Sequence, residues 1–374
     1  MTGESLHRSM IRYLKIRIFC DWSRATISRK NDETPTRVPL FLIICGLLGA
    51  CTTDLDGTDI AAFSNSVSGE ALPWKHEKFD SEDGKFTFAV FADLTGGERP
   101  EVFDIAVAQL NLLRPELIMN VGDLIEGDAL DIDGLNEQWN SFDERAAKAK
   151  APIFYAGGNH DLTGDALRAV WEARNGPRYY HFVYKNVLFL VLDTEDNTTE
   201  RVAEILAARN AAIEIYKTEG MEAFRQTEYW KMPERTSGTI SKEQSDYIIQ
   251  AIERNADVRW TFLFVHKPAW TNEGNETFAA IEGALSERPY TVFNGHVQAY
   301  GYEERLGRDY IQVATTGGEQ FPELGRSMDH VTLVTVDDDG VDIANLMLSG
   351  ILDKNGRVPL GGNEVCFEIA ECGN

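Results

Sequence analysis

Residues 151–161 read APIFYAGGNHD, an apolar run that ends in two glycines and then in three polar residues. Two earlier runs share this design but end in an aspartate: KFTFAVFAD at 85–93 and ELIMNVGD at 116–123. Short apolar runs rich in Val, Ile and aromatic residues predict buried β-strands. The three runs therefore predict strands that each deliver a polar side chain at the carboxyl end.

Later parts of the chain extend this pattern. The runs RWTFLFVHKP and YTVFNGH each reach a histidine, and YYHFVYKNVLFLVLD predicts two strands joined by a hairpin turn at Lys185-Asn186. Helical patterns are expected at about 100–113, 199–234, 241–254 and 277–286, and strands recur through 300–348. Alternating short strands and helices predict an α/β fold built in layers.

Five residues of metal-ligand type follow these predicted strands: Asp93, Asp123, Asn159, His266 and His296. Any one of them alone would more often be a turn or capping residue. Open α/β sheets, however, collect ligand sites along the carboxyl edge of their strands. Their repeated position therefore favours a common metal site.

The polar blocks, taken in order, resemble those of the calcineurin-like metallophosphoesterase superfamily. The matching blocks are Asp93-Leu94-Thr95, Gly122-Asp123, Gly158-Asn159-His160-Asp161, His266 in VHKP, and Gly295-His296-Val297-Gln298. The resemblance implies two facing mixed β-sheets flanked by helices, a four-layer αββα sandwich, with two divalent metal ions at the strand ends. It also implies hydrolysis of a small phosphate ester, monoester or diester, by in-line attack of a metal-activated hydroxide.

Residue by residue, the resemblance gives one intact and one altered metal site. The intact site has Asp123, Asn159, His266 and His296; the altered site has Asp93, Thr95, Asp123 and Gln298, with Thr95 and Gln298 replacing histidines of the family pattern. Imidazoles favour transition metals, whereas an oxygen-only set favours harder ions. We therefore expect one tight ion (Mn, Fe or Zn) and one weaker ion (Mg, Ca or Mn).

His160 resembles the family residue that stabilises the transition state or protonates the leaving oxygen, and Asp161 is expected to orient it. A capping or core histidine is the alternative.

The glycine turn after the first strand is a candidate substrate site. Gly96 and Gly97 allow backbone N–H groups to approach an anion closely, and Arg99 would add charge. A plain tight turn is the alternative. Lys267 is either a phosphate contact or a solvated loop charge.

The N-terminal region predicts export. Residues 38–50 are apolar but too few to cross a bilayer, as in a signal peptide, and Leu48-Gly49-Ala50-Cys51 resembles a lipobox. A buried core helix is the alternative. We expect residues 1–50 to be a signal or pro-region with a doubtful start codon, and 51–80 to be a tether lipidated at Cys51. The expected location is the periplasm-facing outer membrane of a bacterium.

The remaining cysteines fit an oxidising compartment. Cys366 and Cys372 are expected to form a disulfide, although two free thiols are the alternative. The catalytic domain is expected at 81–352, followed by a tail at 353–374. The helical insert at 199–234 would be either a lid or a solvent-exposed decoration.

Composition limits the possible partners. The chain has 374 residues, with 36 Lys and Arg against 60 Asp and Glu, giving a formal charge of −24. Such a chain is a poor match for nucleic-acid phosphates, so no nucleic-acid partner is expected. Because both first-site histidines are missing, a non-catalytic exported binding module remains the alternative to a hydrolase.

Overall fold

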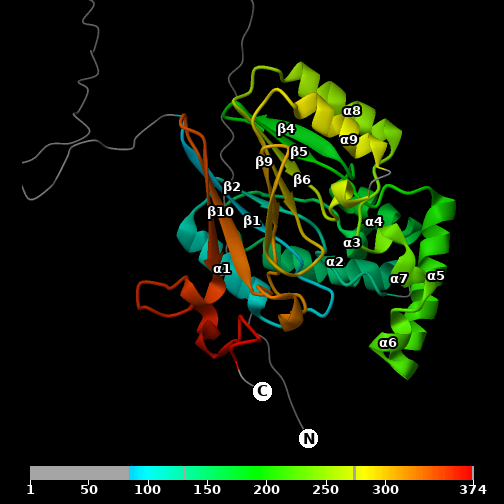
Figure 1. Ribbon diagram of the computed structural model, residues 1–374. Coiled ribbons are helices and arrows are strands. Elements are labelled where there is room, and N and C mark those ends of the chain that lie inside the picture. The colour runs from blue at the N-terminus through cyan, green and yellow to red at the C-terminus, as the bar shows by residue number, and fades with distance from the viewer. Residues whose placement is uncertain (1–83, 130, 273–274, 373–374) are drawn as a thin grey trace, which may run out of the picture. The chain divides into compact units, whose positions relative to one another are not determined.

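The computed structural model describes residues 84–129, 131–272 and 275–372, all of which belong to one compact unit (Figure 1). The predicted signal region, the tether and Cys51 lie outside the described residues. Within the described part, no helix combines the length and the apolar character needed to span a membrane.

The first sheet has five strands in the order β11-β10-β1-β2-β3. They are β1 (Phe86–Phe91), β2 (Leu117–Asn120), β3 (Ile153–Phe154), β10 (His330–Val336) and β11 (Val341–Met347). Strands β1, β2 and β3 are parallel, whereas β10 pairs antiparallel with both β1 and β11. The parallel strands therefore share one carboxyl edge.

The second sheet has six strands in the order β4-β5-β6-β7-β9-β8. They are β4 (Tyr180–Tyr184), β5 (Val187–Val191), β6 (Trp260–Phe264), β7 (Tyr290–Asn294), β8 (Gly301–Arg305) and β9 (Arg308–Gln312). The β4–β5 hairpin turns at Lys185 and Asn186, as the sequence predicts, with φ of 45° and 60°. Two successive positive φ values are typical of a tight hairpin turn.

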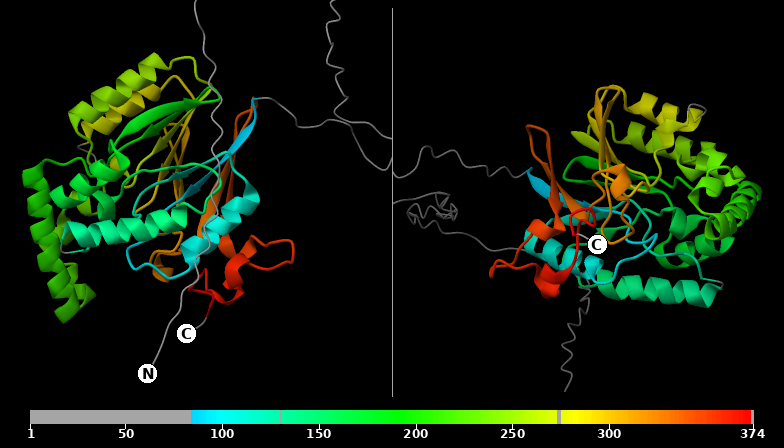
Figure 2. Two further views of the ribbon diagram at one scale, coloured as in Figure 1. Left: turned by 180° about the vertical axis from the view of Figure 1, so that it is seen from behind. Right: turned by 60° about the horizontal axis from the view of Figure 1, so that its bottom comes forward.

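Helices cover the outer face of each sheet (Figures 1 and 2). On the first sheet lie α1 (Val102–Leu113) and α2 (Ile132–Ala146), with α4 (Asp165–Asn175) packed on α2; on the second lie α8 (Lys242–Arg254) and α9 (Glu276–Leu285). Short helical turns occur elsewhere in the described part: α3 (Asn159–Leu162), η2 (Ala269–Thr271), η3 (Pro322–Leu324), η4 (Leu348–Gly350) and η5 (Pro359–Glu364). The sequence patterns identified α1, α8 and α9 but not α2 or α4.

Three apolar clusters hold the four layers together. Phe88 faces the space between the sheets, where it meets Phe189 and Phe262, whereas Phe91 on the same strand packs with Phe103 of α1. Alternate residues of β1 thus enter different clusters, as the period of a strand buried on both faces requires. The predicted αββα sandwich is confirmed.

A helical arm stands out from the sandwich between β5 and α8 (Figure 1). We use this name for residues 198–235, which contain α5 (Thr199–Glu219), α6 (Met221–Phe224), α7 (Glu228–Lys231) and η1 (Pro233–Arg235). Its two ends meet, because Glu195 and Thr239 form a β-bridge just outside it. The arm therefore leaves the sandwich and returns to it at nearly the same place.

The segment after residue 352 is packed rather than extended. Val358 and Phe367 are buried in the apolar cluster that contains Ile105 of α1. Cys366 and Cys372 form a disulfide, the pairing that the sequence predicts. The expected tail is therefore a continuation of the folded unit.

Candidate metal centre

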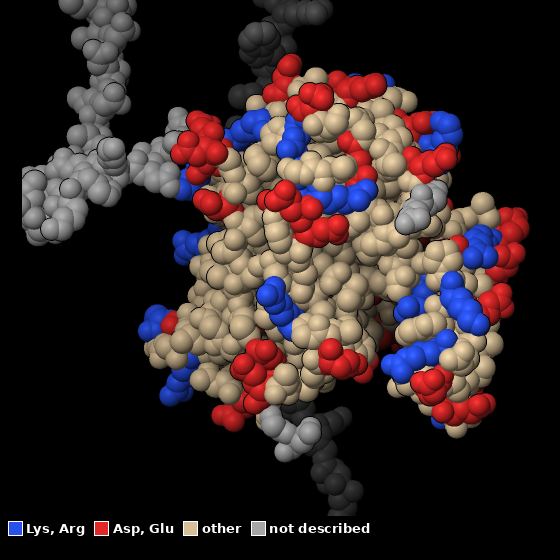
Figure 3. Space-filling view, in the orientation of Figure 1, with Lys and Arg blue, Asp and Glu red and all other residues tan. Residues whose placement is uncertain are grey.

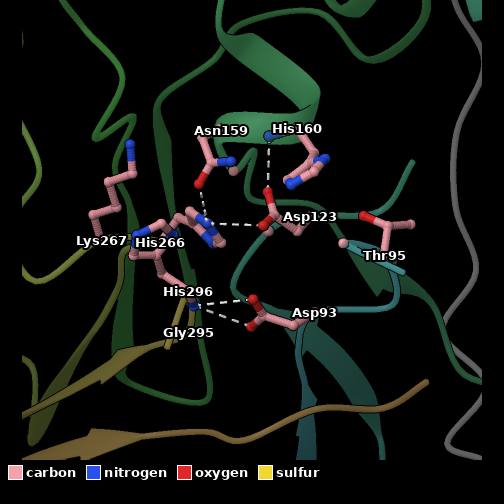
Figure 4. A network of polar contacts seen from close by, with 12 residues as sticks. Asp93, Thr95, Asp123, Asn159, His160, His266, Lys267, Gly295 and His296 are labelled. Atoms are coloured by element: carbon pink, nitrogen blue, oxygen red, sulfur yellow. Dashed lines mark hydrogen bonds and ion pairs between the residues drawn. The ribbon is translucent and has the colours of Figure 1, made fainter. Parts of the chain in front are cut away.

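The predicted site residues lie where central strands of both sheets end (Figure 4). Asp93 follows β1 and Asp123 follows β2, while His266 follows β6 and His296 follows β7. Asn159 begins α3, shortly after β3. The carboxyl ends of parallel strands in both sheets thus bring together residues from five separate segments.

Three of these residues leave their strands through a left-handed backbone conformation. The φ angles of Asp93, Asp123 and His296 are 46°, 59° and 72°. Such a conformation costs a residue with a side chain about 1–2 kcal/mol, and it is concentrated at functional sites. The sharp turns explain how these side chains come to face one another across the edge.

Neighbouring glycines make room for the carboxylates. A Cβ at Gly158 would lie 2.2 Å from Asp123 Oδ1, and a Cβ at Gly295 would lie 2.3 Å from Asp93 Oδ2. Neither position accepts a side chain without displacing an aspartate. The glycines of the GNHD and GHVQ blocks therefore have a steric role beside the site.

His266 is held with one nitrogen facing the other ligands. Its Nδ1 lies 2.8 Å from the Val121 carbonyl oxygen, which can only accept, so Nδ1 carries the proton. Its Nε2 lies 3.1 Å from Asn159 Oδ1 and 3.2 Å from Asp123 Oδ2. With Nε2 deprotonated, three electron-pair donors point at one another, which is an arrangement that a cation satisfies.

His296 is held in the complementary way. Its Nε2 donates to the Arg235 carbonyl oxygen at 2.8 Å, which leaves Nδ1 as the nitrogen with a free lone pair. Asp123, His266 and His296 each offer one ligand atom, and these three atoms lie within 4.8 Å of one another. The donor set of two imidazoles, a carboxylate and the Asn159 amide oxygen suits a transition-metal ion.

The electrostatics of the site also favour a cation. Burial opposes a charge on His266, but the Asp123 carboxylate outweighs it and raises the pKa of His266 to about 9. Burial alone would raise the pKa of Asp123, but His266 and His160 hold it below its usual range. A proton on His266 therefore occupies the place that a divalent ion would take. Burial, together with Lys267, lowers the pKa of His296, which keeps that ring neutral.

The altered half of the site has a different arrangement. The Thr95 hydroxyl donates to the Ile125 carbonyl oxygen at 2.8 Å, and Gln298 Nε2 donates to the Thr95 carbonyl oxygen at 3.2 Å. Both carboxylate oxygens of Asp93 accept from the backbone N–H of His296, at 3.0 and 3.1 Å. Gln298 Oε1 is buried and has no hydrogen-bond partner among the described residues. The Gln298 amide oxygen is therefore a free acceptor in the altered half.

His160 lies beside both halves. Its backbone N–H donates to Asp123 Oδ1 at 2.9 Å, and its ring Nδ1 donates to the Glu126 carbonyl oxygen at 2.6 Å. The remaining nitrogen, Nε2, lies near the glycine turn, because a Cβ at Gly96 would be 3.7 Å from it. This geometry leaves Nε2 available to a ligand.

Asp161 does not orient His160, contrary to the expectation from sequence. Its carboxylate instead accepts from the backbone N–H groups of Gly158, Asp123, Leu124 and Ile125, at 2.8 to 3.2 Å. Neighbouring side chains on a helical turn point in different directions, so Asp161 faces the Asp123 loop rather than the imidazole. It positions the backbone that carries the central carboxylate.

The glycine turn binds an anion, but the anion is internal. The backbone N–H groups of Gly96, Gly97 and Glu98 donate to the Glu126 carboxylate at 3.2, 3.1 and 2.8 Å. No sequence pattern singles out Glu126 for this role. The expected role of Gly96 and Gly97 in holding substrate therefore requires Glu126 to move.

Arg99 points away from the site. Its guanidinium donates to the carbonyl oxygens of Gly318 and Cys366, and it forms an ion pair with Asp329 at 2.5 Å. It therefore fastens the C-terminal segment rather than contacting substrate. Lys267 is likewise no surface charge: it is 4% exposed, and its Nζ lies 2.9 Å from Glu195 Oε1.

Comparison with known proteins identifies the family. A model of the calcineurin-like phosphoesterase family matches residues 86–307, which is more than half of the chain. The chain therefore belongs to the calcineurin-like phosphoesterases, whose chemistry is metal-dependent hydrolysis of phosphate esters. No curated protein matches the chain significantly.

One solved structure supports the fold. A dimetal phosphatase from Danio rerio is 14% identical with a TM-score of 0.50, and the match covers 70% of this chain and 96% of that one. A purple acid phosphatase from yellow lupin (Lupinus luteus) seeds is 13% identical with a TM-score of 0.44, covering 70% and 51%. The first likeness supports the two-sheet sandwich, and neither identifies a substrate.

Proposed function

We propose that this protein hydrolyses small phosphate esters, monoesters or diesters, at a centre built around one firmly held transition-metal ion. The proposal rests on the complementary hydrogen bonding of two imidazoles, each of which bonds to a backbone carbonyl through a different ring nitrogen. His266 gives Nδ1 to a backbone carbonyl and His296 gives Nε2 to another, so the other nitrogens share one small space with Asp123. A capping or packing role requires no such complementary pair.

The ion, when bound, neutralises phosphate oxygens and lowers the pKa of water. The chain adds His160, whose Nδ1–H is fixed by the Glu126 carbonyl so that Nε2 can hold a proton for the leaving oxygen. Asp161 keeps the Asp123 loop in place through its backbone hydrogen bonds. Metal binding, positioning of the Asp123 loop and proton transfer are thus assigned to different residues.

The altered half is proposed to take a second, weaker ion of harder character, such as Mg, Ca or Mn. Its donors are oxygens only, and the Thr95 hydroxyl already donates to a backbone carbonyl. The tight ion is proposed to be Mn, Fe or Zn, because two imidazoles suit these metals.

Export and lipid anchoring at Cys51 are also proposed, with the periplasm-facing outer membrane as the location. The Cys366–Cys372 disulfide supports an oxidising compartment.

Figure 3 shows acidic and basic side chains interspersed on one face, without the continuous basic stripe that a nucleic-acid partner favours.

A non-catalytic metal-binding module is the second candidate. It is favoured by Asp93, whose two oxygens both accept from the backbone of His296. In that case the altered half would be structural.

Hydrolysis of nitrophenyl phosphate and bis-nitrophenyl phosphate, with Mn, Zn, Mg or Ca added singly, separates the two candidates. A hydrolase loses about 10²–10⁴ in rate on His160→Ala, the usual contribution of a proton-transfer residue. His181→Ala is the matched control, since His181 of β4 hydrogen-bonds Tyr247 of α8 and has no place in the site. Absence of turnover with every metal would favour the binding module.

A further inference from the structure

The helical arm returns to the sandwich directly against the metal centre. Its last turn, η1, ends at Arg235, whose carbonyl oxygen accepts from His296 Nε2 at 2.8 Å. The arm therefore supplies the hydrogen-bond acceptor on the far side of one metal-ligand imidazole. This contact joins residues 61 apart in the sequence.

The arm also contacts the loop of the other imidazole. Lys267, the residue after His266, is buried and places its Nζ 2.8 Å from the Glu234 carbonyl oxygen. The same Nζ lies 2.9 Å from a carboxylate oxygen of Glu195, at the base of the arm. Successive carbonyl groups of the arm, at Glu234 and Arg235, thus bond to the two histidine-bearing loops.

Interactions within the arm hold these carbonyl groups in place. The Glu234 carboxylate accepts two hydrogen bonds from Arg201 near the start of the arm, at 2.8 and 2.9 Å. The Arg235 guanidinium lies 3.9 Å above the Trp230 ring, and its Nε donates to the Trp230 carbonyl oxygen at 3.2 Å. The last turn, η1, is therefore held both by Arg201 near the start of the arm and by Trp230 just before the turn.

Burial of apolar surface does not account for the arm. Only Val202, Ile205 and Ala212 of the arm are buried hydrophobic residues, whereas Tyr216 and Met221 are among the exposed ones. The contacts at its return point are polar and concentrated on the two metal-ligand loops. This pattern indicates a role in positioning rather than in core formation.

We propose that the helical arm is a positioning element of the metal centre, which acts through the Arg235 carbonyl on His296. The carbonyl holds the imidazole in the tautomer that carries its proton on Nε2, so Nδ1 faces the ion and the ring cannot rotate. The inference deepens the proposed function and rests on its metal site. An acceptor of this kind orients a ligand and raises its basicity, and its loss typically costs about 10–100-fold in metal affinity.

The test removes the arm and observes His296 first without metal. Residues 198–235 are replaced by a short Gly-Ser linker, which the Glu195–Thr239 bridge permits because the two ends already meet. Long-range ¹⁵N–¹H spectra of the metal-free protein, assigned with His296→Gln, report which ring nitrogen carries the proton. We expect an Nε2–H tautomer in the full chain and a mixture after removal of the arm.

Metal affinity is the second readout, measured for Mn²⁺ and Zn²⁺ by chelator competition. We expect about a 10–100-fold loss without the arm. Glu214→Ala is the matched control on the arm, since it removes only an exposed ion pair with Lys217 and should change neither readout. If the armless chain does not fold, the double variant Arg201→Ala/Glu234→Ala decides, with the same direction expected.

A folded armless or double variant with an unchanged tautomer and unchanged affinity would overturn the inference. Failure of the proposed function looks different. A full chain that shows the Nε2–H tautomer and binds metal, yet hydrolyses no phosphate ester, leaves the positioning role intact and refutes the enzyme.

Discussion

Around His266 and His296, each imidazole gives one nitrogen to a backbone carbonyl and turns the other toward Asp123. Around Thr95 and Gln298, by contrast, the side-chain donors bond to backbone carbonyl oxygens of neighbouring loops, those of Ile125 and Thr95, and neither residue supplies an imidazole. Both regions lie where parallel strands of the two sheets end. The difference is therefore in the direction of the lone pairs, not in the fold.

This contrast shows what a metal site needs beyond the right residue types. In the intact half, the acceptors behind the imidazoles fix which nitrogen is free, which prepares the site before an ion arrives. In the altered half, the Thr95 hydroxyl has a fixed direction toward Ile125, and Gln298 presents a single unpartnered oxygen. We therefore expect the two halves to respond differently to substitution.

The largest effect is expected from His266→Gln. The change removes the buried nitrogen that faces Asn159 and Asp123, so affinity for the tight ion should fall by more than about 100-fold, since loss of an outer partner alone costs 10–100-fold. Chelator competition measures the affinity, and a thermal melt confirms folding. His181→Gln is the matched control; an affinity loss below tenfold would place the ion elsewhere.

The next largest effect is expected to be a gain in bound metal. Thr95→His with Gln298→His restores the imidazoles of the family pattern, so we expect the metal content after dialysis to rise from one tightly held ion per chain toward two. Elemental analysis with the protein concentration measured independently gives the ratio. A wild-type chain that already retains two tight ions would contradict the asymmetry itself.

The sequence predicted the parts of the site that depend on local pattern. Asp93, Asp123, His266 and His296 follow apolar runs. Parallel pairing brings the strand ends of Asp93 and Asp123 together in one sheet, and those of His266 and His296 together in the other. The partners of the site were not predictable in this way. Glu126 reaches the glycine turn across 28 to 30 residues, and Arg235 acts through a backbone carbonyl, which leaves no mark on residue type.

Two errors have the same physical origin. Asp161 is next to His160 in sequence, and Arg99 is close to the glycine turn, yet both side chains point elsewhere. Adjacency in sequence does not determine direction where the backbone turns sharply. The pairing of Cys366 with Cys372 was predictable because they are the two cysteines that remain once the expected signal region and the lipidated Cys51 are set aside.

A smaller effect is expected from Glu126→Ala, which tests the internal anion of the glycine turn. Three backbone N–H groups lose their acceptor, but the site is partly exposed and water replaces much of the loss, so we expect about 1 kcal/mol of destabilisation. Denaturant unfolding measures it. The freed N–H groups should also become available to bind phosphate. Half of the activity should therefore be lost at a lower concentration of inorganic phosphate than in the wild type. Affinity for the tight ion should be unaffected. Glu126→Gln should give a stability and a phosphate inhibition between those of the wild type and Glu126→Ala.

The smallest effect is expected from Thr95→Val, the conservative change in the altered half. It removes the hydroxyl that donates to the Ile125 carbonyl oxygen, at a cost of about 1 kcal/mol in unfolding free energy, while the volume of the buried side chain is preserved. Because the hydroxyl already has a fixed partner, affinity for the tight ion should stay within twofold of wild type by chelator competition. Any Mg²⁺ stimulation of turnover should weaken, since the variant loses one oxygen ligand of the harder ion. If the tight ion is weakened as strongly as by His266→Gln, Thr95 belongs to the same shell as His266, and the two halves are one site.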